Sequence, residues 1–208
     1  MSRRSRSSGR WLQEHFADPF VRRAQDEGWR SRAVFKLEEI DRRAKLLRAG
    51  QVCLDLGAAP GAWTQYLRQR VGRSGRVIAT DILPMTELPG VEFLQGDFET
   101  EEVFNRLLDL APARTVDVVL SDMAPNLSGV DAIDQPRGDR LAELALDMAG
   151  RILKPGGSAL IKVFQGAGTA ALLQSARERF ARVRLMKPAA SRSRSAEMYL
   201  LAMQFRLV

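Results

Sequence analysis

Short apolar runs typical of buried β-strands alternate along this chain with segments of helical periodicity. The predicted strands cover residues 52–56, 76–81, 91–97, 116–122, 159–164, 183–186 and 198–205. The predicted helices cover residues 31–40, 62–70, 101–110, 136–152 and 172–180. Strands that alternate with helices form a largely parallel, doubly wound sheet. The sequence therefore predicts one α/β domain with a mostly parallel seven-stranded sheet and helices on both faces.

The ends of the first four predicted strands carry glycine or aspartate. Gly57 and Gly61 follow the first strand, and Asp81, Asp97 and Asp122 end the next three. In doubly wound sheets, ligands bind beyond the carboxyl ends of the strands, where the strand order reverses. These residues predict a ligand site at that edge, and the alternative is that each aspartate only caps a helix.

The glycine loop at residues 55–63 resembles a nucleotide-binding turn but lacks the G-x-G-x-x-G spacing. Pro60 has no N–H with which to hold a phosphate, and no P-loop lysine follows it. The loop therefore suits a nucleoside that carries something other than pyrophosphate. Asp81 is placed to accept both hydroxyls of a ribose, and Asp97 to accept from an adenine amino group. An adenosine with a zwitterionic amino-acid tail fits these parts, which indicates S-adenosyl-L-methionine as the cofactor.

The composition excludes several other classes of function. The 208-residue chain has one cysteine and one histidine, which exclude an internal disulfide and a zinc site built from those ligands. That histidine, His15, lies in an arginine-rich segment, which disfavours a Ser-His-Asp triad. We expect no metal site. Because no apolar stretch approaches membrane-spanning length, we expect a soluble, cytoplasmic protein with no membrane partner.

Positive charge is concentrated in two parts of the chain. Residues 1–48 hold 13 Lys/Arg and 7 Asp/Glu, and the net charge of the whole chain is +7. A second group without acidic residues lies near the C-terminus and comprises Arg182, Arg184, Lys187, Arg192 and Arg194. Basic clusters beside a near-neutral body are typical of a protein that binds a polyphosphate such as nucleic acid. The alternative is a solvated terminus that only aids solubility.

Seven short motifs, spread over essentially the whole chain, together resemble one known family. They are RWLQEHF at 10–16, RSRAVFK at 30–36, DLGAAPG at 55–61, LQGDF at 94–98, SDMAPN at 121–126, KVFQG at 162–166 and EMY at 197–199. In this order they resemble the FtsJ/RrmJ family of ribosomal RNA ribose 2′-O-methyltransferases. The resemblance implies a Rossmann-like class I S-adenosylmethionine-dependent methyltransferase. Its implied substrate is a uridine of 23S rRNA in the large (50S) ribosomal subunit.

The resemblance also implies roles for individual residues. The catalytic tetrad of the family carries over to Lys36, Asp122, Lys162 and Glu197. The cofactor contacts carry over to Gly61, Trp63, Asp81, Asp97 and Asp122. Two positions depart from the family pattern: Ala62 replaces a usual glycine, and Ala196 replaces a frequent arginine. We interpret residues 1–30 as a basic RNA-binding extension and residues 31–208 as the methyltransferase domain, and expect a monomer.

Lys162 is the best candidate for the base that this chemistry needs. Methyl transfer to a ribose hydroxyl is a direct displacement that benefits from positioning in line and from a base that takes the hydroxyl proton. Lys162 lies within an apolar run, where burial and the nearby Lys36 disfavour the ammonium form, whereas Asp122 and Glu197 favour it. A structural ion pair is the alternative role for Lys162. In contrast, we expect Tyr199 and Met123 to be packing residues.

Other functions remain open at this point. A base N-methyltransferase is disfavoured because residues 122–126, Asp-Met-Ala-Pro-Asn, offer no aromatic side chain to stack on a base. A transfer RNA 2′-O-methyltransferase of the same superfamily would share the tetrad. A non-catalytic RNA-binding factor of ribosome assembly would share the fold and the basic segments.

Overall fold

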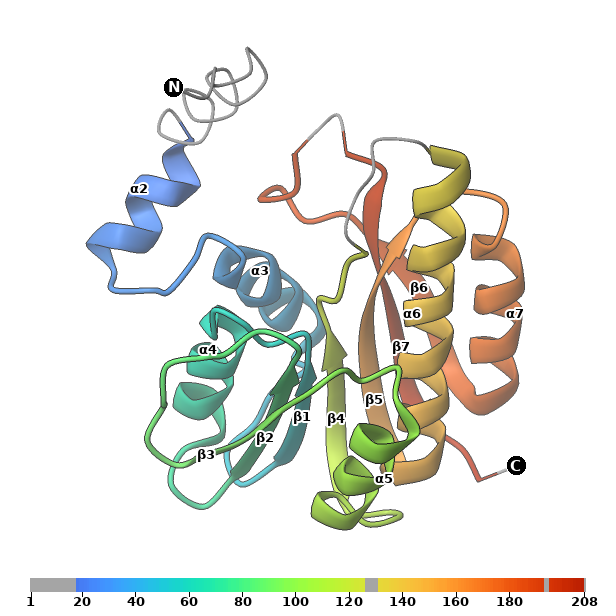
Figure 1. Ribbon diagram of the computed structural model, residues 1–208, viewed down its shortest axis with the longest axis horizontal. Coiled ribbons are helices and arrows are strands. Elements are labelled where there is room, and N and C mark those ends of the chain that lie inside the picture. The colour runs from blue at the N-terminus through green and yellow to red at the C-terminus, as the bar shows by residue number, and fades with distance from the viewer. Residues whose placement is uncertain (1–17, 126–130, 193–194, 208) are drawn as a thin grey trace, which may run out of the picture.

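A seven-stranded sheet forms the centre of the computed structural model, which describes residues 18–125, 131–192 and 195–207 (Figure 1). Its order is β3-β2-β1-β4-β5-β7-β6. The strands are β1 (Val52–Leu56), β2 (Arg76–Asp81), β3 (Val91–Gln95), β4 (Val116–Ser121), β5 (Leu153–Phe164), β6 (Phe180–Met186) and β7 (Glu197–Phe205). All neighbouring pairs up to β5 are parallel, and β7 pairs antiparallel with both β5 and β6. The prediction of a mostly parallel sheet is confirmed.

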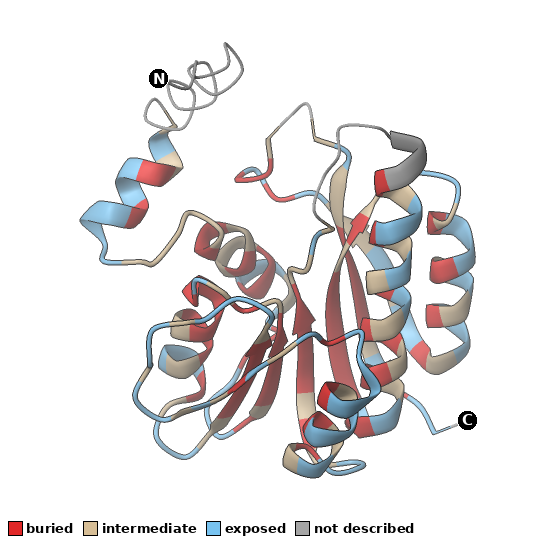
Figure 2. Cartoon of the chain, in the orientation of Figure 1, coloured by how far each residue is buried: buried red, intermediate tan, exposed pale blue. Residues whose placement is uncertain are grey.

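Helices cover both faces of the sheet, as the sequence predicts. They are α2 (Pro19–Asp26), α3 (Val34–Ala44), α4 (Ala62–Val71), α5 (Glu101–Leu110), α6 (Asp131–Ile152) and α7 (Thr169–Arg179). One hydrophobic core joins the sheet to α5, α6 and α7, and a second core joins its other face to α2, α3 and α4. The central strands are buried on both faces, whereas the edge strands β3 and β6 are partly exposed (Figure 2).

Three local features differ from the sequence prediction. Helix α6 begins at Asp131 and not at Pro136, which lies inside the helix. Strand β5 begins at Leu153 and not at residue 159. It therefore includes Pro155, Gly156 and Gly157, which lie beside an irregularity in its pairing with β4. Helix α2 was not predicted, although Asp18 caps it by accepting from the N–H of Phe20 at 2.9 Å. For α6 and β5, packing against the sheet outweighs local propensity, whereas the Asp18 cap of α2 is a local signal that the sequence does contain.

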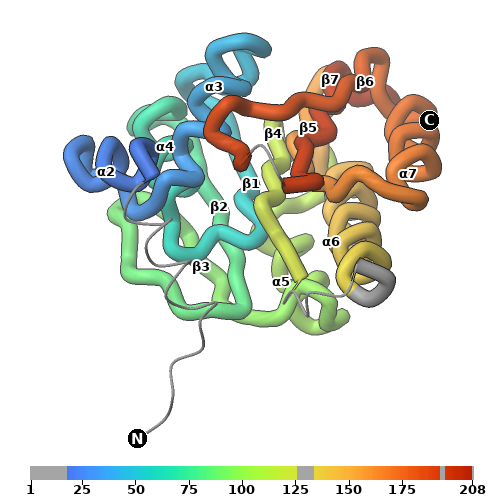
Figure 3. The backbone as a smooth tube through the Cα atoms, turned by 90° about the horizontal axis from the view of Figure 1, so that it is seen from above, coloured from blue at the N-terminus to red at the C-terminus, as the bar shows by residue number. Residues whose placement is uncertain are grey.

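The reversed direction of β7 places its first residues at the functional edge of the sheet. Because β7 is antiparallel to β5, Glu197 lies opposite Phe164 and Tyr199 opposite Lys162. The connection from β6 to β7 crosses the sheet edge towards α3 (Figure 3), where the N–H of Ala189 donates to Glu39 at 2.7 Å. Residues from α3, β4, β5 and β7 therefore meet at one edge.

Asp41 fixes α3, the helix that carries Lys36, onto α4. Its carboxylate is buried and accepts from the N–H of Leu47 at 2.8 Å, the hydroxyl of Tyr66 at 2.9 Å and Nε of Arg70 at 3.0 Å. A buried carboxylate with three donors is satisfied only while all its partners stay in place.

We predict that Asp41→Ala lowers the free energy of unfolding by about 3 kcal/mol, because it leaves the buried Tyr66 hydroxyl and Leu47 N–H unsatisfied. Urea denaturation measures this change. The matched control is Asp26→Ala on α2, where the side chain is exposed and the expected change is within about 0.5 kcal/mol. Equal effects of the two substitutions would contradict the anchoring role of Asp41.

The loop after β1 and the loop after β4 touch at Gly57. This glycine has a φ of +76°, and a Cβ there would lie 2.6 Å from Cγ of Met123 and 3.0 Å from its backbone N. The two loops can approach this closely because Gly57 has no side chain. Gly57 and Met123 both line one pocket, so their contact holds two of its walls together.

We predict that Gly57→Ala destabilises the protein more than Gly28→Ala does. Gly28 has a similar φ of +72° but nothing within 4 Å of a built Cβ, so its substitution isolates the backbone strain, about 1–2 kcal/mol. Gly57→Ala adds the collision with Met123, about 1–3 kcal/mol more. Thermal unfolding of both variants measures the difference, and equal losses would show that the contact is relaxed.

Candidate active site

A pocket of about 550 Å³ lies beyond the carboxyl ends of β1, β2 and β4. Three predicted cofactor residues line it: Asp81, Asp97 and Asp122. The strand order reverses between β1 and β4, so the pocket lies where ligands bind in doubly wound sheets. The predicted convergence of strand-end carboxylates at one edge is therefore present in the structure.

Two of these carboxylates also hold the pocket walls. Asp81 accepts from the N–H groups of Ala59 and Leu83, both at 2.8 Å, and so ties the loop after β1 to the loop after β2. Asp97 accepts from the N–H of Glu99 at 2.9 Å. A carboxylate has about four acceptor positions, so both groups keep capacity for a ligand. The alternative of a purely local structural role is thus realised in part.

The other two predicted cofactor residues, Gly61 and Trp63, do not line the large pocket. Gly61 begins α4 with a φ of +104°, and a Cβ there would lie 2.7 Å from Nη1 of Arg30. Arg30 donates at this place to the carbonyl oxygens of Pro60, Thr86 and Glu87. Trp63 is buried under α3 and donates from Nε1 to the carbonyl of Ala33 at 2.8 Å. Gly61 and Trp63 therefore do not line the large pocket, but they hold the start of α4 against Arg30 and α3.

The four residues of the predicted tetrad lie together in the structure. Nζ of Lys162 is 2.8 Å from Oδ1 of Asp122 and 3.8 Å from Oε2 of Glu197. Nζ of Lys36 is 2.6 Å from Oε1 of Glu197. Lys162 is 8% exposed, so its ammonium group depends on these partners.

Tyr199 is a central member of the cluster that the sequence analysis missed. Its hydroxyl donates to Oδ1 of Asp122 at 2.6 Å and lies 3.3 Å from both Oε1 of Glu197 and Nζ of Lys36. The expectation that it only packs was wrong. The available signal was the two-residue spacing from Glu197, which places both side chains on one face of a strand.

The cluster keeps Asp122 ionised and its phenol neutral. Burial by itself raises the pKa of the Asp122 carboxyl, but the charges of Lys162 and Lys36, with hydrogen bonds from Lys162 and Tyr199, hold that pKa below its usual range. Burial, together with the charges of Asp122 and Glu197, raises the pKa of Tyr199 well above its ordinary value. Tyr199 therefore acts as a neutral hydrogen-bond donor between the two carboxylates.

Asp55, below the large pocket, is a buried acid of a different kind. Burial raises its pKa to about 7, and the charges of Asp122 and Asp81 add to this effect, while a hydrogen bond from Thr64 opposes it. Thr64 donates to Oδ2 at 2.6 Å, and Oδ1 has no partner among the described residues. A carboxyl in this environment is partly protonated at neutral pH.

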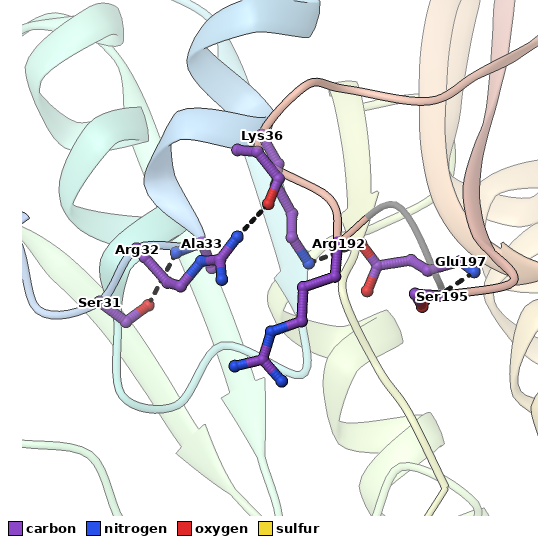
Figure 4. A pocket seen from close by; sticks show the side chains of 8 residues that line it. Ser31, Arg32, Ala33, Lys36, Arg192, Ser195 and Glu197 are labelled. Carbon is purple, nitrogen blue, oxygen red and sulfur yellow. Dashed lines mark hydrogen bonds and ion pairs between the residues drawn. The ribbon is translucent and has the colours of Figure 1, made fainter. Parts of the chain in front are cut away.

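A second pocket, of about 300 Å³, is lined by two other members of the tetrad (Figure 4). Lys36 and Glu197 line it together with Ser31, Arg32, Ala33, Ala190, Arg192 and Ser195. Arg32 is held by Asp18 and by the carbonyl of Ala190. Arg192 has no side-chain partner among the described residues, and its guanidinium group points away from the other labelled side chains in Figure 4. The tetrad therefore contributes Asp122 to the larger pocket and Lys36 and Glu197 to the smaller one, while Lys162 joins these residues without lining either pocket.

Neither a membrane helix nor a metal cluster is found in the described ranges 18–125, 131–192 and 195–207. No helix there is long and apolar enough to cross a membrane. No group of three or more His, Cys, Asp or Glu side chains there could hold a metal ion.

Comparisons with known proteins confirm the family resemblance. A family model described as FtsJ-like methyltransferase matches residues 29–205. The ribosomal RNA large subunit methyltransferase E of Legionella pneumophila (strain Corby) is 55% identical over 98% of this chain and 99% of that protein. The protein of the same name from Xanthomonas campestris pv. campestris (strain B100) is 56% identical over 97% and 96%.

A solved structure shares the fold. A crystal structure described as a ribosomal RNA methyltransferase from Plasmodium falciparum superposes with a TM-score of 0.75 at 27% identity, covering 85% of this chain and 98% of that one. With a family match across most of its length and curated relatives above half identity, this chain belongs to the FtsJ-like methyltransferases and is a methyltransferase enzyme.

Proposed function

We propose that this enzyme transfers a methyl group from S-adenosyl-L-methionine to the ribose 2′-hydroxyl of a uridine in 23S rRNA of the large ribosomal subunit. The observation that carries the proposal is that the tetrad connects two pockets, with Asp122 in one and Lys36 and Glu197 in the other, since a direct displacement needs donor and acceptor on opposite sides of the reacting centre. The names of the relatives support large-subunit rRNA as the substrate. The family resemblance supports the ribose hydroxyl and the uridine.

The larger pocket fits the proposed cofactor. Asp81 and Asp97 present carboxylates that suit a ribose diol and an amino group, and Gly57 leaves the pocket floor as bare backbone. When bound, S-adenosyl-L-methionine supplies an electrophilic methyl group on a sulfonium sulfur. Asp122 lies on the wall shared with the tetrad and so is nearest to the reacting centre.

Lys162 is the proposed base in this mechanism. In the proposed step Lys162 first loses its own proton to solvent, and its amine would then accept the proton of the 2′-hydroxyl as the new O–C bond forms and the C–S bond of the sulfonium breaks. Asp122 orients Lys162 and stays ionised, because its lowered pKa makes it a weak proton acceptor. Lys36 holds Glu197, and Tyr199 ties Glu197 to Asp122, so the base keeps a fixed direction. The main rival reading, a purely structural ion pair, leaves the hydroxyl without a base.

The smaller pocket is the proposed place of the target nucleotide. Arg32 and Lys36 line its walls, and the guanidinium of Arg192 is available to a phosphate.

We further propose that residues 1–30 form a basic RNA-binding extension; residues 1–17 lie outside the described part of the chain. One chain supplies the whole tetrad, which supports the proposal of a monomer, and the proposed ribosomal substrate supports a cytoplasmic location.

The proposal is tested by methyl transfer from labelled cofactor to large subunits from a strain that lacks this enzyme. We expect turnover that ends near one methyl group per subunit, on a uridine 2′-oxygen, and none on subunits that are already methylated. Transfer to transfer RNA in place of rRNA would favour the tRNA enzyme of the same superfamily. Binding without any transfer would favour a non-catalytic assembly factor.

We predict that Lys162→Ala lowers the rate of methyl transfer by about 10²–10⁴-fold, the usual contribution of a general base, while cofactor binding persists. Single-turnover kinetics and calorimetric titration with the cofactor measure the two properties separately. The matched control is Lys154→Ala on the same strand, whose ammonium group pairs with Asp117 at 3.1 Å away from the tetrad. Normal turnover of the Lys162 variant would refute the assignment.

A further inference from the structure

The described members of the basic group near the C-terminus lie in more than one place in the structure, and Arg194 lies outside the described residues. Arg192 lines the small pocket beside the tetrad, whereas Arg182 and Arg184 lie on the edge strand β6. There they line a separate groove of about 230 Å³ together with Arg43 from α3. The floor of this groove is apolar and includes Ala44, Leu201 and Met203. We name the groove lined by Arg43, Arg182 and Arg184 the distal groove.

The three guanidinium groups of the distal groove are available to a ligand. Arg182 and Arg184 are exposed, and neither side chain makes a hydrogen bond or ion pair with the described residues. Arg43 is 56% exposed and pairs at 3.1 Å with Glu39 on its own helix, an exposed pair of little strength. An alternative role for charges on an edge strand is to prevent pairing with a strand of another molecule. That role does not explain why an arginine of α3 converges on the same groove.

The distal groove lies on the same face of the sheet as the tetrad. Along β7, Tyr199 pairs with Met186, Leu201 with Arg184, and Met203 with Arg182. The groove therefore begins two residues from Tyr199 and extends to four, or about 7–13 Å along the strand. This spacing is within the reach of a few nucleotides of one RNA strand.

Basic residues also lie between the two sites. Lys187 follows β6 directly and donates to the carbonyl of Ser195 at 2.8 Å, and Arg192 lies further along the same connection. The connection thus carries positive charge from the distal groove to the small pocket. When one nucleotide of a polyanion lies in the small pocket, the part of the strand outside the pocket can lie along this positive charge.

We propose that the distal groove binds backbone phosphates of the rRNA strand that presents its ribose to the tetrad. This inference rests on the proposed function and adds a second contact surface for the same substrate. The guanidinium groups donate to phosphate oxygens, and the apolar floor accepts a sugar or the face of an unstacked base. Because phosphate contacts position the strand, the groove sets the affinity for the substrate and not the rate of the chemical step.

The test compares two variants with the same change in net charge. The groove variant is Arg43→Gln, Arg182→Gln and Arg184→Gln together, and the control is Arg73→Gln, Arg106→Gln and Arg177→Gln, three exposed arginines on other surfaces. Filter binding to large subunits across salt concentrations measures affinity without catalysis. For the groove variant we expect a log–log salt slope smaller by about 2, which is three contacts at roughly 0.7 each. We also expect a higher KM with kcat unchanged.

The outcomes separate this inference from the proposed function. Equal slopes and KM values for the groove variant and the control would overturn the inference, even where the wild-type enzyme methylates its substrate. Failure of wild-type transfer would instead contradict the proposed function, and the binding slopes would still report on the groove.

A second measurement distinguishes RNA from an acidic ribosomal protein as the occupant. An iron chelate attached at Arg184→Cys cleaves nucleic acid within its immediate reach, and labelling is selective because the native Cys53 is buried. We expect cuts in 23S rRNA within a few nucleotides of the methylated uridine. Cleavage confined to protein, or no cleavage of rRNA in the bound complex, would overturn the inference.

Discussion

The buried ammonium group of Lys162 is the constraint on which the rest of the site depends. A cation in the interior of a sheet persists only with counter-charges and hydrogen-bond partners, and removal of one partner leaves an uncompensated charge. Those partners come from other elements: Asp122 after β4, and Glu197 from β7, which Lys36 of α3 holds in place. The order of strands and the packing of α3 are therefore conditions for the cluster, and the cluster in turn fixes how these elements meet.

The antiparallel strand β7 makes this arrangement possible. A parallel strand beside β5 would bring its last residues to the functional edge, whereas β7 brings its first. Glu197 and Tyr199 consequently lie beside Lys162 as strand residues, and Ser191 of the connection before β7 donates to Oε1 of Glu197 at 2.9 Å. Because strand residues are held more firmly than loop residues, the carboxylate of Glu197 and the hydroxyl of Tyr199 keep fixed directions.

The sequence predicted the strands well from their apolar runs. It also predicted that the strand-end acids meet, because parallel strands bring their carboxyl ends to one edge for any conformation of the loops. It failed where tertiary contacts decide. Tyr199 looked like a core residue, and it is one by burial, but its hydroxyl joins two carboxylates that only the fold brings near it. Pro136 was predicted to start a helix, yet α6 begins five residues earlier and its buried face packs into the core. The tetrad itself was found through the family motifs, since spacing alone does not place Lys36 near Glu197.

The charges of the centre and of its surroundings are divided in a way that suits a reaction on RNA. The tetrad combines two cations with two anions, so the centre itself offers little net attraction to a polyanion. Attraction therefore falls to residues outside it: Arg192 at the small pocket, and Arg182 and Arg184 on the edge strand. This separation has a chemical consequence. Binding of phosphates at a distance leaves the contacts of Lys162 with Asp122 and Glu197 in place, so different residues can set the affinity for the substrate and the orientation of the base.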